Sequence, residues 1–77
     1  MNQYKIGYSK SLESRIKTLQ SSNYVELKLV KAFSTLFAFE DEQYLHCLMS
    51  KYKIHGEWFE FPDEIIKDLS WFKSITN

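Results

Sequence analysis

The sequence predicts one small domain of the α/β or α+β class. The chain has 77 residues, of which 44% are hydrophobic and 17% aromatic, and this composition is typical of a packed globule rather than a disordered tail. Patterns typical of strands and of helices alternate in the order β-α-β-α-β-α with short connections. No linker, repeat or low-complexity segment interrupts them, so we expect residues 1–77 to form a single domain.

The first half of the chain predicts two strands and a helix. Residues 3–8 are rich in aromatic and β-favouring side chains and predict a strand. Ser11 is a candidate cap for a helix that residues 21–23 end, and the apolar residues of this helix recur at helical spacing at Leu12, Ile16 and Leu19. Residues 25–29 alternate between apolar and charged side chains, which predicts a second strand, with a bulge or bend where the alternation changes phase after Leu29.

The second half predicts a long helix, a strand and a last helix. The long helix is expected from about residue 36 to residue 52, and a polar loop over residues 53–56 follows it. Residues 57–61 predict a strand that Pro62 ends. Asp63 is a candidate cap for the last helix, whose inward-facing residues are Ile65, Ile66, Leu69 and Phe72.

Charge and cysteine content exclude several classes of function. The formal net charge is 0, which argues against strong, indiscriminate binding to nucleic acid. Residues 1–31 contain six basic and two acidic residues, whereas the chain from residue 32 onward contains four basic and eight acidic residues. The domain therefore has either a basic and an acidic face or simply solvated charges. No segment is suited to span a membrane, and the single cysteine, Cys47, cannot form an internal disulfide. We therefore expect a protein of a reducing compartment, cytoplasmic or nuclear, without a membrane partner.

Two residues are unusual for their positions. Glu42 falls within the apolar stripe of the helix predicted over residues 36–52, whose other members are Ala38, Leu45, Leu48, Met49 and Tyr52. A carboxylate on a buried face is costly unless it is paired, hydrogen-bonded or bound to a metal, so Glu42 is either a structural pairing residue or a functional ligand. Arg15 is the one arginine beside nine lysines, which favours a position where a planar donor fork contacts phosphate; a lone surface arginine is the alternative.

Four short motifs occur in order over residues 4–61. They are Tyr4-Lys5-Ile6-Gly7-Tyr8-Ser9, Arg15 with Leu19, Glu42 with Leu45-His46, and Gly56-Glu57-Trp58-Phe59. Together they make the chain resemble the KIG-type branch of the GIY-YIG nuclease superfamily, a branch common in phage and large-DNA-virus proteins. The resemblance implies an α+β fold with a small antiparallel β-sheet flanked by helices. It also implies a DNA endonuclease that hydrolyses the phosphodiester of one strand at a single Mg²⁺ or Mn²⁺ ion.

The resemblance further implies roles for individual residues. Glu42 would hold the metal ion and Arg15 would stabilise charge on the phosphate, so these two are the expected catalytic residues. Lys5 and Gly7 would line the strand that faces the DNA. His46, four residues after Glu42, either shares the metal ion or supports the site by packing and hydrogen bonding, and we favour the second role.

The chain departs from the family pattern at its start. Lys5 replaces the tyrosine of the second motif, and only three residues precede Tyr4, so the first strand of the family has no counterpart. We therefore expect the strand over residues 3–8 to have an open edge, which favours a homodimer or a larger assembly. Three functions stay open. The first is a metal-dependent DNA endonuclease, either self-sufficient or complete only as an oligomer. The others are an inactive protein-interaction module, and an inactive module that binds DNA through the basic residues Lys5, Lys10, Arg15 and Lys17.

Overall fold

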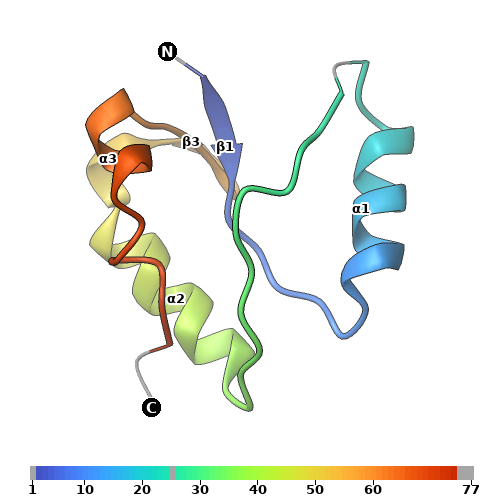
Figure 1. Cartoon of the computed structure of the whole chain (residues 1–77), viewed down its shortest axis with the longest axis horizontal. Helices are drawn as coiled ribbons and strands as arrows, with labels where there is room; N and C mark the ends of the chain where they lie inside the picture. The colour runs from blue at the N-terminus through green and yellow to red at the C-terminus, as the bar shows by residue number, and fades with distance from the viewer. Residues whose placement is uncertain (1, 25, 75–77) are drawn as a thin grey trace.

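The computed structural model describes residues 2–24 and 26–74, and within them a three-stranded antiparallel sheet is accompanied by three α-helices (Figure 1). The elements in chain order are β1 (Gln3–Lys5), α1 (Leu12–Ser21), α2 (Ala38–Leu48), the 3-10 helix η1 (Ser50–Tyr52), β2 (Lys53–His55), β3 (Trp58–Glu60) and α3 (Asp63–Lys67). The predicted α+β class is confirmed. The predicted order of elements is wrong, because the second described strand comes after α2 rather than before it.

The sheet has the strand order β1-β3-β2, so β1 and β2 form its two edges. β1 pairs antiparallel with β3 and places Tyr4 opposite Phe59. β2 also pairs antiparallel with β3, with an irregularity between Lys53 and His55. The polar loop expected over residues 53–56 is therefore wrong: three of its residues form an edge strand, and Gly56, with a φ of 54°, lies in the turn that follows.

The strand predicted over residues 25–29 is wrong for residues 26–29, and Val25 lies outside the described residues. Residues 26–33 have no regular secondary structure and, within the described part of the chain, form no backbone–backbone hydrogen bond. Leu29 and Val30 are consequently 56% and 54% exposed. An alternating pattern makes a strand only where another strand completes the ladder of hydrogen bonds, and no strand of the described sheet pairs with this segment.

The helices begin close to the predicted positions. The Ser11 hydroxyl accepts a 3.5 Å hydrogen bond from the Ser14 N–H, which confirms Ser11 as the cap of α1. The helix expected over residues 36–52 is divided, because α2 ends before η1 begins. α3 starts at Asp63, but Pro62 holds the cap position, so Asp63 is not the cap. None of the helices in the described residues is long and apolar enough to cross a membrane.

The core joins the sheet to α2 and to the segment around α3. Phe59 on β3 has no exposed surface and stacks on Phe61, with the ring centroids 5.5 Å apart. The Trp71 ring packs against Phe61, and its Nε1 atom donates a 2.9 Å hydrogen bond to the Ile65 carbonyl oxygen. The other buried apolar residues are Ile6, Leu45 and Met49. This core fixes the end of β1, α2 and the β2–β3 hairpin relative to one another.

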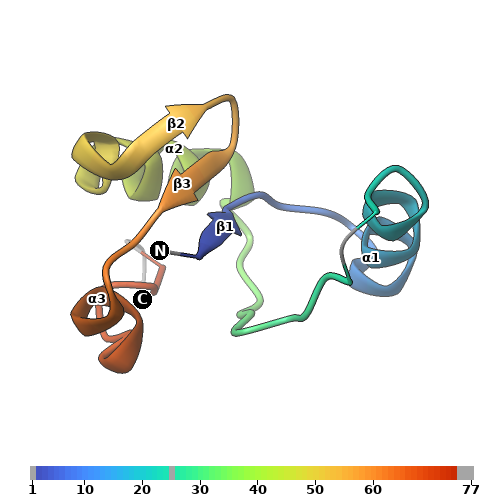
Figure 2. The same ribbon diagram turned by 90° about the horizontal axis from the view of Figure 1, so that it is seen from above.

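α1 stands apart from this core, as both views show (Figures 1 and 2). None of its residues is buried. Arg15 links α1 to the β2–β3 turn through Glu57, with Nη2 and Oε1 3.3 Å apart. Gln20 links it to the next segment, because its Oε1 atom accepts a 2.7 Å hydrogen bond from the Leu27 N–H. α1 therefore adds little to the core and places one arginine at the end of the sheet.

Candidate functional site

One carboxylate oxygen gathers two cations at the end of the sheet. Glu57 lies in the turn between β2 and β3, and its Oε1 atom is 3.2 Å from Lys5 Nζ and 3.3 Å from Arg15 Nη2. Lys5 Nζ also lies 5.1 Å from the centre of the Trp58 ring, a cation–π contact. The side chains of Lys5, Arg15 and Glu57 are 21%, 39% and 31% exposed, so solvent reaches all three. The cluster thus joins β1, α1 and the hairpin turn.

Gly7 leaves the space that this carboxylate occupies. A Cβ atom at position 7 would lie 3.1 Å from Glu57 Oε1, which is tighter than an ordinary van der Waals contact. The Ile6 N–H donates a 3.0 Å hydrogen bond to the Glu57 carbonyl oxygen, which holds the turn beside residues 6 and 7. Because the φ of Gly7 is not positive, glycine is needed here for the close approach of Glu57 rather than for an unusual backbone conformation.

Glu42 lies on α2 beside the same segment. It is 9% exposed, its carboxylate accepts a hydrogen bond from the Tyr8 N–H, and its Oε2 atom has no hydrogen-bond partner. Burial raises the pKa of the Glu42 carboxyl above its ordinary value, and the negative charge of Glu57 raises this pKa further. His46, Arg15 and the Tyr8 N–H offset part of this rise. A buried, incompletely bonded carboxylate is a candidate functional group, because a purely structural one would have its hydrogen bonds completed.

His46 connects α2 to the residues after β1. Its Nε2 atom lies 2.9 Å from the Ile6 carbonyl oxygen, and because a carbonyl oxygen only accepts, Nε2 carries the hydrogen. The ring also meets Phe59 edge to face, with the centroids 4.9 Å apart. These contacts hold His46 in place beside Glu42 and leave its Nε2 atom engaged with the backbone.

Of the seven predicted site residues, the structure brings four together around Glu57, places His46 beside Glu42, and leaves two apart. Those that surround Glu57 are Lys5, Gly7, Arg15 and Glu42. Lys10 and Lys17 are exposed and form no ion pair within the described residues. Glu57 itself was not among the predicted site residues, although its position directly after the turn glycine Gly56 in the fourth motif is a usable signal. A second buried carboxyl, Asp41 with 2% exposure, was also missed.

The oxygen donors fit a divalent cation that keeps most of its water. Within residues 2–24 and 26–74, no group of three or more His, Cys, Asp or Glu side chains is placed to hold a metal ion. Glu42 nevertheless offers an oxygen without a partner, and Glu57 is close enough to act on it through its charge. Mg²⁺ is commonly bound by one or two carboxylates together with water and phosphate oxygens, so these two residues fit such an ion.

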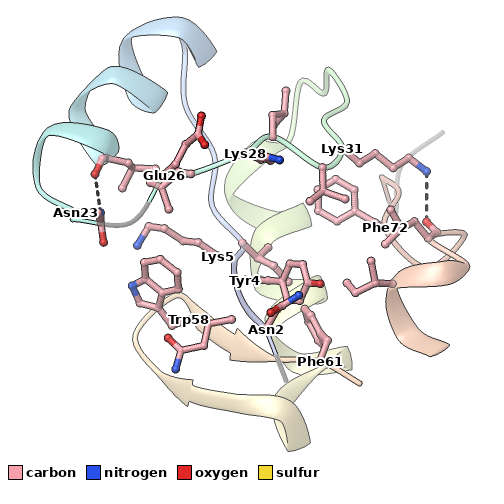
Figure 3. Close-up of a pocket in the computed structure, with 18 of the residues that line it drawn as sticks. Asn2, Tyr4, Lys5, Asn23, Glu26, Lys28, Lys31, Trp58, Phe61 and Phe72 are labelled. Atoms are coloured by element: carbon pink, nitrogen blue, oxygen red, sulfur yellow. Dashed lines mark hydrogen bonds between the residues drawn. The ribbon is translucent and has the colours of Figure 1, made fainter. Parts of the chain in front are cut away.

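A groove of about 680 Å³ runs beside the edge of the sheet that β1 forms. Residues of β1 and β3 supply one wall, including Tyr4 and Trp58, and residues 26–31 supply the other (Figure 3). Lys28 lines this second wall, and Lys31 Nζ donates a 3.3 Å hydrogen bond to the Leu69 carbonyl oxygen across its end. The irregular segment therefore faces β1 across a space rather than pairing with it.

Fold and site together define a small α+β domain whose charged cluster joins a sheet end, a detached helix and a hairpin turn. A family model for the T5orf172 domain matches residues 1–75, so the chain belongs to the T5orf172 domain family. It is similar to Uncharacterized protein 460R of Invertebrate iridescent virus 6, with 35% identity over 66 residues. That match covers 83% of this chain but 30% of the viral protein, so the chain spans less than a third of that relative. No solved structure matches the chain significantly.

Proposed function

We propose that this domain binds the phosphodiester backbone of DNA at the Lys5, Arg15 and Glu42 cluster and acts as a metal-dependent endonuclease of the GIY-YIG type. One observation carries this proposal: the buried Glu42 has an oxygen without a partner, next to a carboxylate that holds two cations. A metal-binding oxygen beside cationic donors is the combination that phosphodiester hydrolysis requires. Membership of the T5orf172 family supports a nuclease-like or DNA-binding role.

Each residue has a physical role in this proposal. Glu42 would hold Mg²⁺ or Mn²⁺, which supplies charge stabilisation at the phosphate and a more acidic bound water. Arg15 would offer its planar donor fork to the phosphate oxygens, and Lys5 would add a point charge on the same side. His46 would keep α2 in register with the residues after β1, because it donates to the Ile6 carbonyl oxygen.

Nicking of supercoiled plasmid DNA tests the catalytic part. We expect nicked circles in Mg²⁺ and none in EDTA, and no nicking by Glu42→Gln or Arg15→Ala. Glu40→Gln is the matched control, because it removes the same charge from an exposed position of the same helix. Equal nicking by the wild type and the Glu42→Gln variant would point to a contaminating nuclease and contradict the proposal.

DNA binding is tested separately, because a domain of this kind can keep the phosphate site without catalysis. Neutralising Lys5 and Arg15 together should weaken binding to a labelled duplex about tenfold or more and flatten its dependence on salt. Lys67→Ala and Lys73→Ala, both exposed and outside the cluster, should change binding little. Salt-sensitive binding without nicking would assign the chain to the DNA-binding alternative.

A second function is favoured by the groove beside β1. An edge strand with open backbone groups, facing a segment whose backbone is also unpaired, suits the insertion of an extended chain. We propose that a second copy of this chain supplies the inserted extended segment, because the basic first half and the acidic second half are complementary in charge.

Sedimentation velocity over a concentration series tests this dimer. We expect association by the wild type, and its loss in Leu29→Asp, which alters an exposed groove residue. Leu48→Asp is the control, since Leu48 is 47% exposed on α2 and does not line the groove. A wild-type protein that stays monomeric at high concentration would rule out the homodimer.

A further inference from the structure

The Glu57 carboxylate occupies the place where an anionic ligand of Lys5 and Arg15 would bind. Both cations contact a single oxygen, Oε1, at 3.2 and 3.3 Å. Two charged donors converging on one oxygen is also how such donors hold a phosphate oxygen. The Glu57 side chain is 31% exposed, and ion pairs open to water are exchanged readily for other partners. A phosphate that binds both cations must therefore displace Glu57.

Glu42 and Glu57 flank the same short segment of backbone. Glu42 accepts a hydrogen bond from the Tyr8 N–H, and Glu57 Oε1 lies against the position where a Gly7 side chain would start. The two carboxylates thus approach adjacent residues from α2 and from the hairpin turn. Glu42 keeps one oxygen without a hydrogen-bond partner. If Glu57 is released from Lys5 and Arg15, its carboxylate can therefore share a cation with this oxygen.

Charge balance links the binding of a phosphate to the binding of a divalent cation. Lys5 and Arg15 carry two positive charges, and Glu42 and Glu57 two negative charges, so the cluster is close to neutral. A phosphate bound alone would add negative charge next to both carboxylates, and a divalent cation bound alone would add positive charge next to both cations. Bound together, each ligand offsets the charge of the other.

We propose that Glu57 is an exchangeable carboxylate: it holds Lys5 and Arg15 in the free protein and joins Glu42 at a divalent cation when a phosphate replaces it. This inference rests on the proposed phosphate site and adds its regulation. A cation and a nucleic-acid phosphate then bind with positive cooperativity, and Glu57 keeps the site closed in their absence. Removal of the Glu57 charge should therefore tighten DNA binding when no cation is present.

Fluorescence anisotropy with a fluorescein-labelled 20-base-pair DNA duplex tests this, in EDTA and in Ca²⁺, an oxygen-preferring ion chosen to limit cleavage. The wild type should bind about tenfold more tightly in Ca²⁺ than in EDTA. Glu57→Gln should bind in EDTA about tenfold more tightly than the wild type and gain less than about twofold from Ca²⁺. Glu60→Gln, with the same loss of charge on β3, should behave as the wild type. Weaker binding by Glu57→Gln in EDTA, or an unchanged response to Ca²⁺, would overturn the proposal.

A second variant guards against an effect on folding. Gly7→Ala keeps both carboxylates but brings a Cβ atom to 3.1 Å from Glu57 Oε1, so Glu57 must shift slightly, which should weaken its contacts with the cations and also tighten binding in EDTA. Circular dichroism must show the same helix content in all variants, because Arg15 and Glu57 also anchor α1. Weaker binding by Gly7→Ala in EDTA, with the fold intact, would contradict the exchange.

Failure of the proposed function is recognised separately. If the wild type and Arg15→Ala are equally unable to bind the duplex, the phosphate site is wrong. Mn²⁺ titration of a Lys5→Ala/Arg15→Ala double variant, in which Glu57 is released from both cations without any phosphate, then tests the part that concerns Glu57; the paramagnetic resonance of the free ion follows binding. In this double variant, adding Glu57→Gln should weaken Mn²⁺ binding about fivefold more than adding Glu60→Gln does. Equal affinities would show that Glu57 does not reach the cation and would overturn the exchange.

Discussion

Replacing Glu42 by Gln should stabilise the protein while it removes the proposed metal ligand. The pKa of the Glu42 carboxyl is raised, chiefly by burial and then by the charge of Glu57, so the folded state binds this proton more tightly than the unfolded state does. The stability that comes from this bound proton is therefore fully present below the ordinary carboxyl pKa, and it is lost as the pH rises through the raised pKa of Glu42. At neutral pH the wild type bears this loss, and the Glu42→Gln variant does not.

The size of the gain follows from the unpartnered oxygen. Glu42 is 9% exposed and its Oε2 atom accepts no hydrogen bond. A buried polar group without a partner costs about 1–3 kcal/mol, and a neutral amide costs less to bury than a charged carboxylate. We expect Glu42→Gln to raise the free energy of unfolding by about 1–2 kcal/mol at pH 7. In a domain of this size, 1 kcal/mol corresponds to about 4–8 °C in Tm.

Thermal unfolding between pH 4 and pH 8 measures the effect. The gain should be absent at the acid end and grow as the pH rises, while Glu40→Gln, on the exposed side of α2, should stay within about 0.5 kcal/mol of the wild type. Mn²⁺ should raise the Tm of the wild type and not that of Glu42→Gln. A loss of more than about 1 kcal/mol in Glu42→Gln at neutral pH would refute this reasoning, because it would mean that Glu42 is a structural pairing residue.

Two further predictions concern the frame that holds the site. Phe59→Ala should lower the free energy of unfolding by about 3–5 kcal/mol, because the ring has no exposed surface and packs on Phe61. Leu48→Ala, at a 47% exposed position, is the control and should lower it far less. Urea unfolding measures both. Gly56→Ala should cost about 1–2 kcal/mol in the same assay, since φ is 54° at that position, and a neutral effect would show that the turn tolerates a side chain.

The sequence predicted those elements whose signal is local. α1 was predicted from its capping serine and from apolar residues at helical spacing, and both features lie within the helix itself. β3 was predicted from aromatic residues ended by a proline. β2 was missed because Lys53–His55 is only three residues long, too short to show a period, and is exposed throughout; its pairing with β3 is made through the backbone. The strand expected over residues 25–29 failed for the opposite reason, since its alternation is clear but the partner that would complete it is absent from the described sheet.

In the site, too, only the features with a local signal could be predicted from the sequence. The helical period placed Glu42 on the buried face of α2, and the structure confirms that burial. The meeting of Lys5 and Arg15 at Glu57 was not predictable from spacing, because it depends on where a hairpin turn places residue 57 relative to β1 and on where a detached helix places residue 15. Lys10 and Lys17 were expected to join the basic surface on composition alone, and the described ion pairs do not include them.

The physical link between the four motifs is Glu57. Lys5 and Arg15 would repel each other if no anion lay between them, and Gly7 is small so that this anion can approach. Glu42, in turn, would carry a lower pKa if Glu57 were neutral, because the charge of Glu57 is the second cause of its raised value. The chemical meaning of each motif therefore depends on the charge state and position of one residue in the hairpin turn. This dependence explains why short motifs, each weak alone, are informative when they occur together, and why substitutions within the cluster are expected to be strongly non-additive.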